Sequence, residues 1–412
     1  MINSRFDAQS FYAPEEINRW RTLALGIGGI LSIVILVIAL IFPEQREQAL
    51  RSWLLGFIFW GGIGIGSLGI LILQYVTGGA WGVISRRILE AGSRTLPVIF
   101  VLFLPIMLGV TYLYEWSHLI GKDEIINHRQ PYLSVGWFIF RTVLYFVLWG
   151  VMAYLLNRWS AQQDQTTDYD TATKLLSDAS KFSGPALAFY ILVVSFAAID
   201  WVMTLDPHWY STMWGFLFVA GWGLSCFSFV VAILALLSDK APMSRILGKR
   251  HFHDIGKLML ALVMVWAYFN FSQYLIIWSG NLPEETKWYI TRMEGAWGAI
   301  GLLLLLFHFA FPFLVLLNRD IKRNAKWLAV LAVFILLLRL LDMYYLIGPS
   351  PRIGTHGKEL EFLASFSWMD IVAPFAVGGI WLWAFFGELK KRPLVPVNDP
   401  YLENAVNHGK GH

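Results

Sequence analysis

The chain has 412 residues, of which 57% are hydrophobic and 15% are charged, against about 25% charged residues in soluble domains. This composition excludes an ordinary soluble protein, and a net charge of +4 does not indicate a nucleic-acid partner. Cys226 is the only cysteine, which excludes internal disulfides and cysteine-held metal clusters. The absence of a C-x-x-C-H motif also excludes covalently attached c-type haem.

The apolar stretches follow a polar N-terminal segment, 1–21, in which no secretory signal is visible. A bilayer crossing takes about 20 apolar residues, and ten stretches reach that length. We therefore predict an all-α integral membrane protein with about ten transmembrane helices, whose first span acts as its own membrane signal and whose residues 389–412 form a tail. In chain order the predicted spans are 22–42, 53–76, 95–115, 134–155, 184–205, 211–237, 255–279, 295–317, 326–347 and 369–388.

The distribution of Lys and Arg between the loops predicts the orientation of these spans. The two termini and the loops that share their side, with the flanks of the adjoining spans, carry 22 of the 32 basic residues, and the opposite loops carry 8. The remaining two, Arg141 and Arg339, lie inside spans. Because basic residues concentrate on the cytoplasmic side and face anionic lipid there, we expect both termini in the cytoplasm.

An internal repeat divides the spans into two halves. The second span opens with GFIFWGGIG (56–64) and the sixth with GFLFVAGWG (215–223), 159 positions later. The fourth and eighth spans both end in LLNR (155–158 and 316–319). The fifth and ninth both place an Asp seven residues before a Pro.

Each repeated unit has four spans, so both copies face the same way in the membrane, as in other proteins with parallel repeats. We predict two four-helix bundles, 53–205 and 211–347, with the spans 22–42 and 369–388 at the periphery. The glycines of the second span are expected to allow close helix packing.

Four charged residues within the spans need a partner or a function, because an ionised side chain at mid-bilayer costs about 2.5–3.5 kcal/mol or more. Arg141 and Asp200 fall at similar depths in neighbouring spans and are expected to meet. Arg339 and Asp342 lie one helical turn apart on one face. Each pair is either a neutralised contact that holds its bundle together or a site where a carboxylate takes up and releases a proton.

Three further residues are candidates for a proton path. His308 is the only histidine deep in a span, so a haem held by two facing histidines is not expected, and the ring is either a proton relay or a hydrogen-bonded core side chain. Asp206 and His208 flank Pro207, which ends the fifth span. Their placement at the outer interface suits a docking surface or a proton exit.

Polar residues in two spans are candidates for the lining of a cavity inside the protein. Lipid-exposed polar groups without partners are costly, so the polar residues of the seventh span are expected to line a cavity or an interhelical hydrogen-bond chain, and the cavity is favoured. These residues are Tyr268, Asn270, Gln273 and Tyr274, to which the upper half of the third span adds Tyr112 and Glu115.

Three stretches carry a resemblance to a known family: DWVMTLDPHWYSTMWG, FSQYLIIWSGNLPEETKWY and LQYVTGGAWGVISRRILEAGSRTLP. Over about residues 15 to 392 the chain resembles the polysulfide-reductase (NrfD-like) membrane subunits, and among them the quinone-binding subunit 2, the F subunit, of bacterial alternative complex III. That resemblance implies a quinol:cytochrome c oxidoreductase complex in the bacterial inner membrane. Its other members would be a homologous ten-helix membrane subunit, an iron–sulfur protein, and multihaem and monohaem cytochrome c subunits.

The same resemblance implies the division of labour in this complex. Quinol, either menaquinol or ubiquinol, is oxidised near the outer face, and haem c and iron–sulfur clusters belong to partner subunits, so this chain binds no redox cofactor of its own. We expect a non-catalytic subunit that supports quinol oxidation and forms a proton path. The alternatives are a chain that itself binds the quinol and, from a different class, a secondary transporter, which would need broken helices in both halves.

Overall fold

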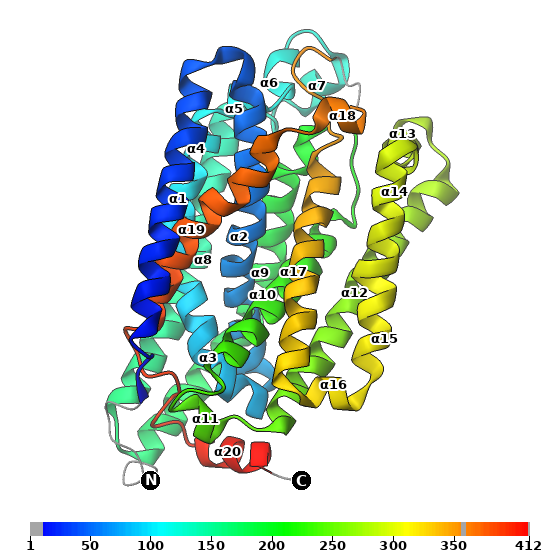
Figure 1. Cartoon of the computed structure of the whole chain (residues 1–412). Coiled ribbons are helices and arrows are strands. Elements are labelled where there is room, and N and C mark those ends of the chain that lie inside the picture. The colour runs from blue at the N-terminus through cyan, green and yellow to red at the C-terminus, as the bar shows by residue number, and fades with distance from the viewer. Residues whose placement is uncertain (1–10, 356–359, 411–412) are drawn as a thin grey trace.

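A computed structural model describes residues 11–355 and 360–410, and every regular element in these ranges is a helix (Figure 1). The bundle contains α1 (Glu16–Ile41), α2 (Pro43–Thr77), α3 (Ala80–Ser93), α4 (Leu96–Leu108), α8 (Val135–Gln165), α9 (Tyr169–Trp201), α10 (Trp214–Leu237), α12 (Lys249–Gly280), α14 (Gly295–Leu303), the π-helix η4 (Leu304–Ala310), α15 (Phe311–Leu317), α17 (Ala325–Ile347) and α19 (Trp368–Leu389). Shorter helices at its two ends are α5 (Val110–Leu113), α6 (Trp116–Leu119), α7 (Glu124–Arg129), the 3₁₀-helix η3 (Met203–Leu205), α11 (Met243–Ile246), α13 (Pro283–Met293), α16 (Arg319–Arg323), α18 (Phe362–Ser365) and α20 (Leu402–Lys410).

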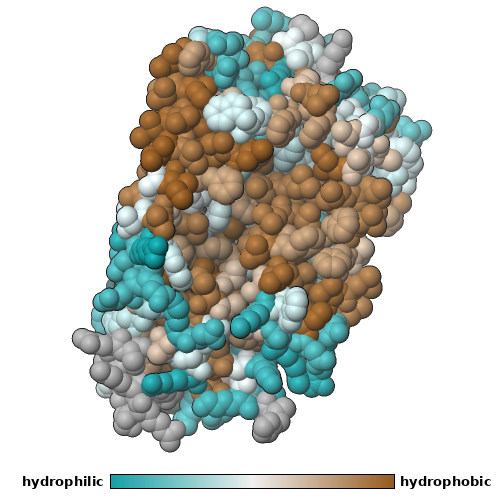
Figure 2. All heavy atoms as spheres, viewed as in Figure 1, coloured by the Kyte–Doolittle hydropathy of each residue, from teal (hydrophilic) through white to brown (hydrophobic). Residues whose placement is uncertain are grey.

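Within the described ranges, nine helical stretches are long and apolar enough to cross a membrane, and the bent pair α3–α4 makes a tenth. The prediction of a multi-pass helical membrane protein is therefore confirmed. Figure 2 shows the corresponding apolar surface along the bundle, with hydrophilic residues at the ends.

The third span differs from its predicted range of 95–115. Its helical structure begins at Ala80, bends by 40° between α3 and α4, and ends before Glu115. The charged residues of α3 made this stretch resemble a loop in the sequence. In the structure they are buried, and Arg87 and Glu90 neutralise each other. Hydropathy alone misses such a helix, because it weighs charged residues without regard to their partners.

The helices α2 and α10 form the centre of the bundle and are almost entirely buried. Their glycines make this packing close. A Cβ on Gly66 would lie 2.6 Å from the carbonyl oxygen of Trp222, and one on Gly62 would lie 2.3 Å from the indole ring of that tryptophan. In a membrane, where lipid is as apolar as a side chain, close packing of this kind is what drives helices together.

The contact between α2 and α10 joins equivalent positions of the two halves. Ser67 and Cys226, which are 159 positions apart like the repeated motifs, lie with Oγ and Sγ 3.5 Å from each other. On either side, α2 packs against α9 and α17, and α10 packs against α17 and α9. Two equivalent units related by an approximate two-fold axis between α2 and α10 would give this pattern.

The last span, α19, is less peripheral than predicted. It crosses α1 and α2 (Figure 1) and buries Trp381 and Phe385 completely. The reason is the small residues at the crossing: a Cβ on Gly28 of α1 would lie 2.7 Å from the Cα of Gly379. The helix α1, in contrast, leaves most of its apolar surface uncovered.

The described N-terminal and C-terminal segments lie at the same end of the bundle. The backbone N–H of Leu394 donates to the carbonyl oxygen of Phe11 at 2.8 Å, and α20 lies at this end in Figure 1. The opposite end carries α6, α7, α13 and α18. We call these the terminal end and the loop end.

Candidate functional site: two buried ion pairs

The first ion pair joins α8 to α9. Nε and Nη2 of Arg141 donate to the two carboxylate oxygens of Asp200 at 2.8 and 2.9 Å, and the Tyr145 hydroxyl donates to Oδ2 at 2.7 Å. The guanidinium lies 3.8 Å from the centre of the Tyr132 ring. A bidentate arrangement is the strong geometry for this pair. The carboxylate is completely buried, and Arg141 and Tyr145 both reach it from α8.

A cavity of about 520 Å³ lies beside this pair at the loop end. Tyr132 lines it and also covers Arg141, while Ile199 and Thr204 line it from the two sides of Asp200 along the chain. The Tyr132 side chain therefore lies between the ion pair and a cavity that is large enough to hold water.

The second ion pair lies within α17. Arg339 and Asp342, one turn apart, are paired through Nη1 and Oδ2, and both are buried. Nε1 of Trp266 on α12 donates to the same carboxylate oxygen at 3.2 Å, and Nε of Arg339 lies 3.4 Å from Oγ of Ser225 on α10. Gly221 makes room for the guanidinium, since a Cβ there would lie 2.2 Å from Nη2.

His308 completes this second cluster from the remaining helix of the second half. Its ring is fully buried, lies 4.1 Å from the Trp266 ring centre to centre, and finds no hydrogen-bond partner for either nitrogen among the described residues. It lies in the π-helix η4, four residues before Pro312, which has no N–H for the carbonyl of His308. Single-turn π segments inside transmembrane helices are frequent at functional sites.

Both predicted pairings are therefore confirmed, but the two pairs differ in the helices from which their side chains come. Arg141 and Asp200 connect two helices, whereas Arg339 and Asp342 belong to one helix and are held by side chains from its neighbours. Together with Ser225, Trp266 and His308, the second pair draws one or more side chains from all four spans of the second half.

Asp206 and His208 lie apart from these pairs, in the connection after η3. Nε2 of His208 lies 3.0 Å from Oδ2 of Asp123, and this contact lowers the pKa of Asp123. Burial raises the pKa of Asp206, against the opposing charge of Arg292. Arg129 holds the turn itself by donating to the carbonyl oxygen of Pro207 at 2.6 Å.

The polar residues of the seventh span do not gather in one cavity. Gln273 is buried in a hydrogen-bond chain, accepting from Ser211 at 2.9 Å and donating to Tyr289 at 3.1 Å. Asn270 donates to the backbone of its own helix, and Tyr268 is 64% exposed. Tyr268 thus lies on a face of α12 that the described chain leaves uncovered, while Gln273 takes part in a hydrogen-bond chain.

The remaining candidates are also dispersed. Tyr274 stacks on Trp278 at 5.5 Å, an aromatic contact rather than a polar one. Tyr112 is 48% exposed, and the guanidinium carbon of Arg46 lies over its ring, 4.6 Å from the ring centre. Glu115 is buried at the start of α6.

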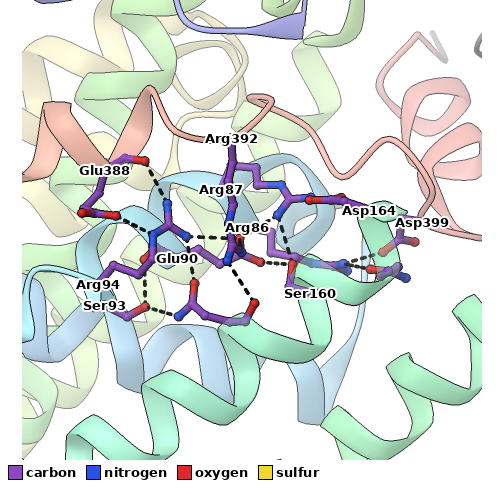
Figure 3. A network of polar contacts seen from close by, with 12 residues as sticks. Arg86, Arg87, Glu90, Ser93, Arg94, Ser160, Asp164, Glu388, Arg392 and Asp399 are labelled. Atoms are coloured by element: carbon purple, nitrogen blue, oxygen red, sulfur yellow. Dashed lines mark hydrogen bonds and ion pairs between the residues drawn. The ribbon is translucent and has the colours of Figure 1, made fainter. Parts of the chain in front are cut away.

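The sequence reasoning missed a larger cluster at the terminal end, shown in Figure 3. Its centre is Glu90 on α3, which is completely buried and accepts from Arg87 at 2.8 Å, Ser160 at 2.5 Å and Arg392 at 3.2 Å. Arg94 completes the ring of cations around this carboxylate at 3.7 Å.

The cluster is neutral and joins distant parts of the chain. Arg86 pairs with Asp399 at 2.5 Å, Arg87 also pairs with Asp164, and Arg94 pairs with Glu388 at 2.9 Å. Its four arginines thus face four carboxylates. It attaches the segment after α19 to α3 and α8, and its sequence signal was the helical spacing of charges in ISRRILEAGSR.

The described residues contain no group of three or more His, Cys, Asp or Glu side chains placed to hold a metal ion. Comparison of the chain with known family models and with curated proteins finds no match. The class that the fold defines is a multi-pass helical membrane protein with paired charges inside its bundle.

Proposed function

We propose that the chain is an integral membrane subunit of a bacterial quinol:cytochrome c oxidoreductase of the alternative complex III type, in which it supports quinol oxidation and provides a path for protons. The observation that carries this proposal is the presence, in each half, of a carboxylate paired with an arginine within the apolar helices. The second pair lies next to a buried histidine that has no hydrogen-bond partner in the part of the chain that the structure describes. Ionisable groups within spans are functional candidates by default because their burial is costly.

In this proposal the carboxylates exchange protons and the arginines set their affinity for them. Asp200 is the first candidate, because the Tyr145 hydroxyl donates to it and a cavity at the loop end lies beside Tyr132, which covers its partner Arg141. Asp342 and His308 act in the other half, with the imidazole able to carry a proton on either nitrogen. Asp206 and His208 remain candidates for the exit at the loop end.

The proposed partners follow the family resemblance. They are a homologous ten-helix membrane subunit, an iron–sulfur protein, and multihaem and monohaem cytochrome c subunits. Haem c and the iron–sulfur clusters would lie in these partners, while this chain holds no redox centre. The proposed location is the bacterial inner membrane with the terminal end in the cytoplasm.

Two observations favour this proposal over its alternatives. Tyr268 is largely exposed and Gln273 is already bonded within the bundle, which speaks against a quinol head group held by these residues in this chain. The bend between α3 and α4 has no counterpart in α12, the corresponding helix of the second half, whereas a transporter built on the repeat would need breaks in both halves.

The test uses the purified complex in liposomes, with the Asp200→Asn variant compared with wild type. We expect quinol:cytochrome c turnover to continue, and the protons freed from the oxidised quinol still to appear. The additional proton release on the loop side, which requires transfer across the membrane, should fall at least roughly tenfold, because an amide cannot exchange a proton at this position. The measurements are cytochrome reduction by absorbance and proton release by a pH-sensitive dye.

Asp200→Glu is the matched variant, since it keeps a carboxylate and should restore part of the proton release. Wild-type proton release in Asp200→Asn would contradict the proton-path role and leave the residue as a structural counter-ion of Arg141. Absence of any quinol:cytochrome c turnover in the purified wild-type assembly would contradict the assignment to the complex.

A further inference from the structure

A groove of about 670 Å³ runs along the outside of the first half, between α4 and α8. Most of its lining is apolar, and its polar residues lie at one end. Phe100 and Phe146 belong to the apolar part, and Arg94, Asn157, Arg158 and Arg392 form the polar end. A volume of this size is typical of a site for a small-molecule ligand.

One face of α8 lines the groove. Val143, Val147, Gly150 and Tyr154 follow one another at intervals of three and four residues, on one face of the helix. A Cβ added at Gly150 would meet no heavy atom within 4 Å, so the space in front of this glycine is open.

The polar end contains one arginine that is free to bind a ligand. Arg94 donates to Glu388 and Asn157, and Arg392 donates to Glu90 and to the carbonyl oxygen of Asn157 (Figure 3). Arg158, one residue further along α8, is exposed and has no ion pair or side-chain hydrogen bond to any described residue. The groove therefore ends in an unpaired guanidinium.

The length of the groove matches one leaflet of a bilayer. From Val143 to Arg158 is fifteen residues, which at 1.5 Å per residue is about 22 Å. Half of a bilayer of about 40–45 Å, head groups included, is about 20–22 Å. If Arg158 lies at the head-group level of the terminal end, Val143 lies near the middle of the membrane.

We propose that this groove binds one anionic phospholipid of the leaflet at the terminal end, with its phosphate on Arg158 and an acyl chain along Gly150 toward Val143. The charge supports a lipid over a transmembrane helix of another protein, because a phosphate oxygen satisfies the free guanidinium, whereas an apolar helix would leave it unpaired. The site is independent of the proton path, so it stands or falls separately from the proposed function.

The experiment titrates the purified, delipidated full-length chain with phosphatidylglycerol or with phosphatidylcholine and counts bound lipids by native mass spectrometry. We expect one tightly held phosphatidylglycerol, bound roughly tenfold more tightly than phosphatidylcholine. Arg158→Gln should remove most of this preference, because the net negative charge of phosphatidylglycerol loses its charged partner.

Two control variants make the result specific to the groove. Gly150→Phe should fill the groove and abolish the tight site, while Gly136→Phe, also on α8 and also facing open space, should leave it intact. Arg319→Gln, at the position equivalent to Arg158 in the second LLNR motif, should leave the preference for phosphatidylglycerol unchanged.

Unchanged tight binding in Gly150→Phe or Arg158→Gln would overturn the proposal. A second measurement places a photo-crosslinking amino acid at Val147 in intact membranes. Crosslinks to lipid would support the lipid site, and a crosslink to the transmembrane helix of another protein in its place would overturn it.

Discussion

Asp200 and Asp342 occupy corresponding helices, but their arginines reach them in different ways. Arg141 comes from the neighbouring helix and is 14% exposed, so the first pair holds two helices together at the edge of a cavity. Arg339 comes from the same helix and is almost completely buried. The ion pair therefore joins two helices in the first half, whereas in the second half it neutralises charge within a single helix.

This difference predicts how each pair responds to mutation. Arg339→Leu should lower the free energy of unfolding by about 3–5 kcal/mol, because it leaves a buried carboxylate without its cation. The double variant Arg339→Leu with Asp342→Leu should recover most of that loss, since it removes both charges. Thermal unfolding of the purified chain in detergent, followed by circular dichroism, measures both.

Arg141→Leu provides the comparison for the first pair. It should cost less than Arg339→Leu, because water in the adjoining cavity can solvate the remaining Asp200 and Tyr145 still donates to it. A double Arg339–Asp342 variant as unstable as the single one would show that packing around these side chains, and not charge pairing, governs the second cluster.

At the scale of the helix, the glycines of α2 determine how closely the two halves approach. Gly66→Ala should destabilise the protein by about 1–3 kcal/mol, because its Cβ would meet the backbone of α10, which a side-chain rotation cannot relieve. Gly150→Ala, facing open space, should instead stabilise α8 by about 0.5–1 kcal/mol through helix propensity. Melting temperatures in the same detergent test this opposite sign, and equal effects would contradict it.

The sequence predicted the helices well where hydropathy carried the signal, and it predicted both intramembrane ion pairs from depth and helical spacing. It missed α3, since the charges of Arg86, Arg87 and Glu90 look like those of a loop until their partners are known. One of those partners, Arg392, is 302 positions from Glu90. Local patterns contain no information on such a distant contact, and for the same reason they did not reveal that Tyr268 faces outward.

At the scale of the whole molecule, the cluster around Glu90 fixes the segment after α19 beneath the first half. This cluster holds the C-terminal segment against α3, and the backbone hydrogen bond from Leu394 to Phe11 holds it against the N-terminal segment. Both described ends of the chain therefore lie on one side, and the excess of basic residues in the terminal end and its loops predicts that this side faces the cytoplasm.

The orientation can be tested because the single cysteine, Cys226, is completely buried, so the native chain should give almost no background with a membrane-impermeant maleimide. Glu403→Cys places an exposed thiol on α20 at the terminal end, and Glu124→Cys places one on α7 at the loop end. We expect Glu403→Cys to be labelled in inside-out vesicles and protected in spheroplasts, and Glu124→Cys to show the reverse. Labelling of both variants from one side would contradict the odd number of crossings predicted between these two positions. A complete exchange of the two results would place the terminal end outside the cytoplasm and remove the basis for the proposed direction of proton release.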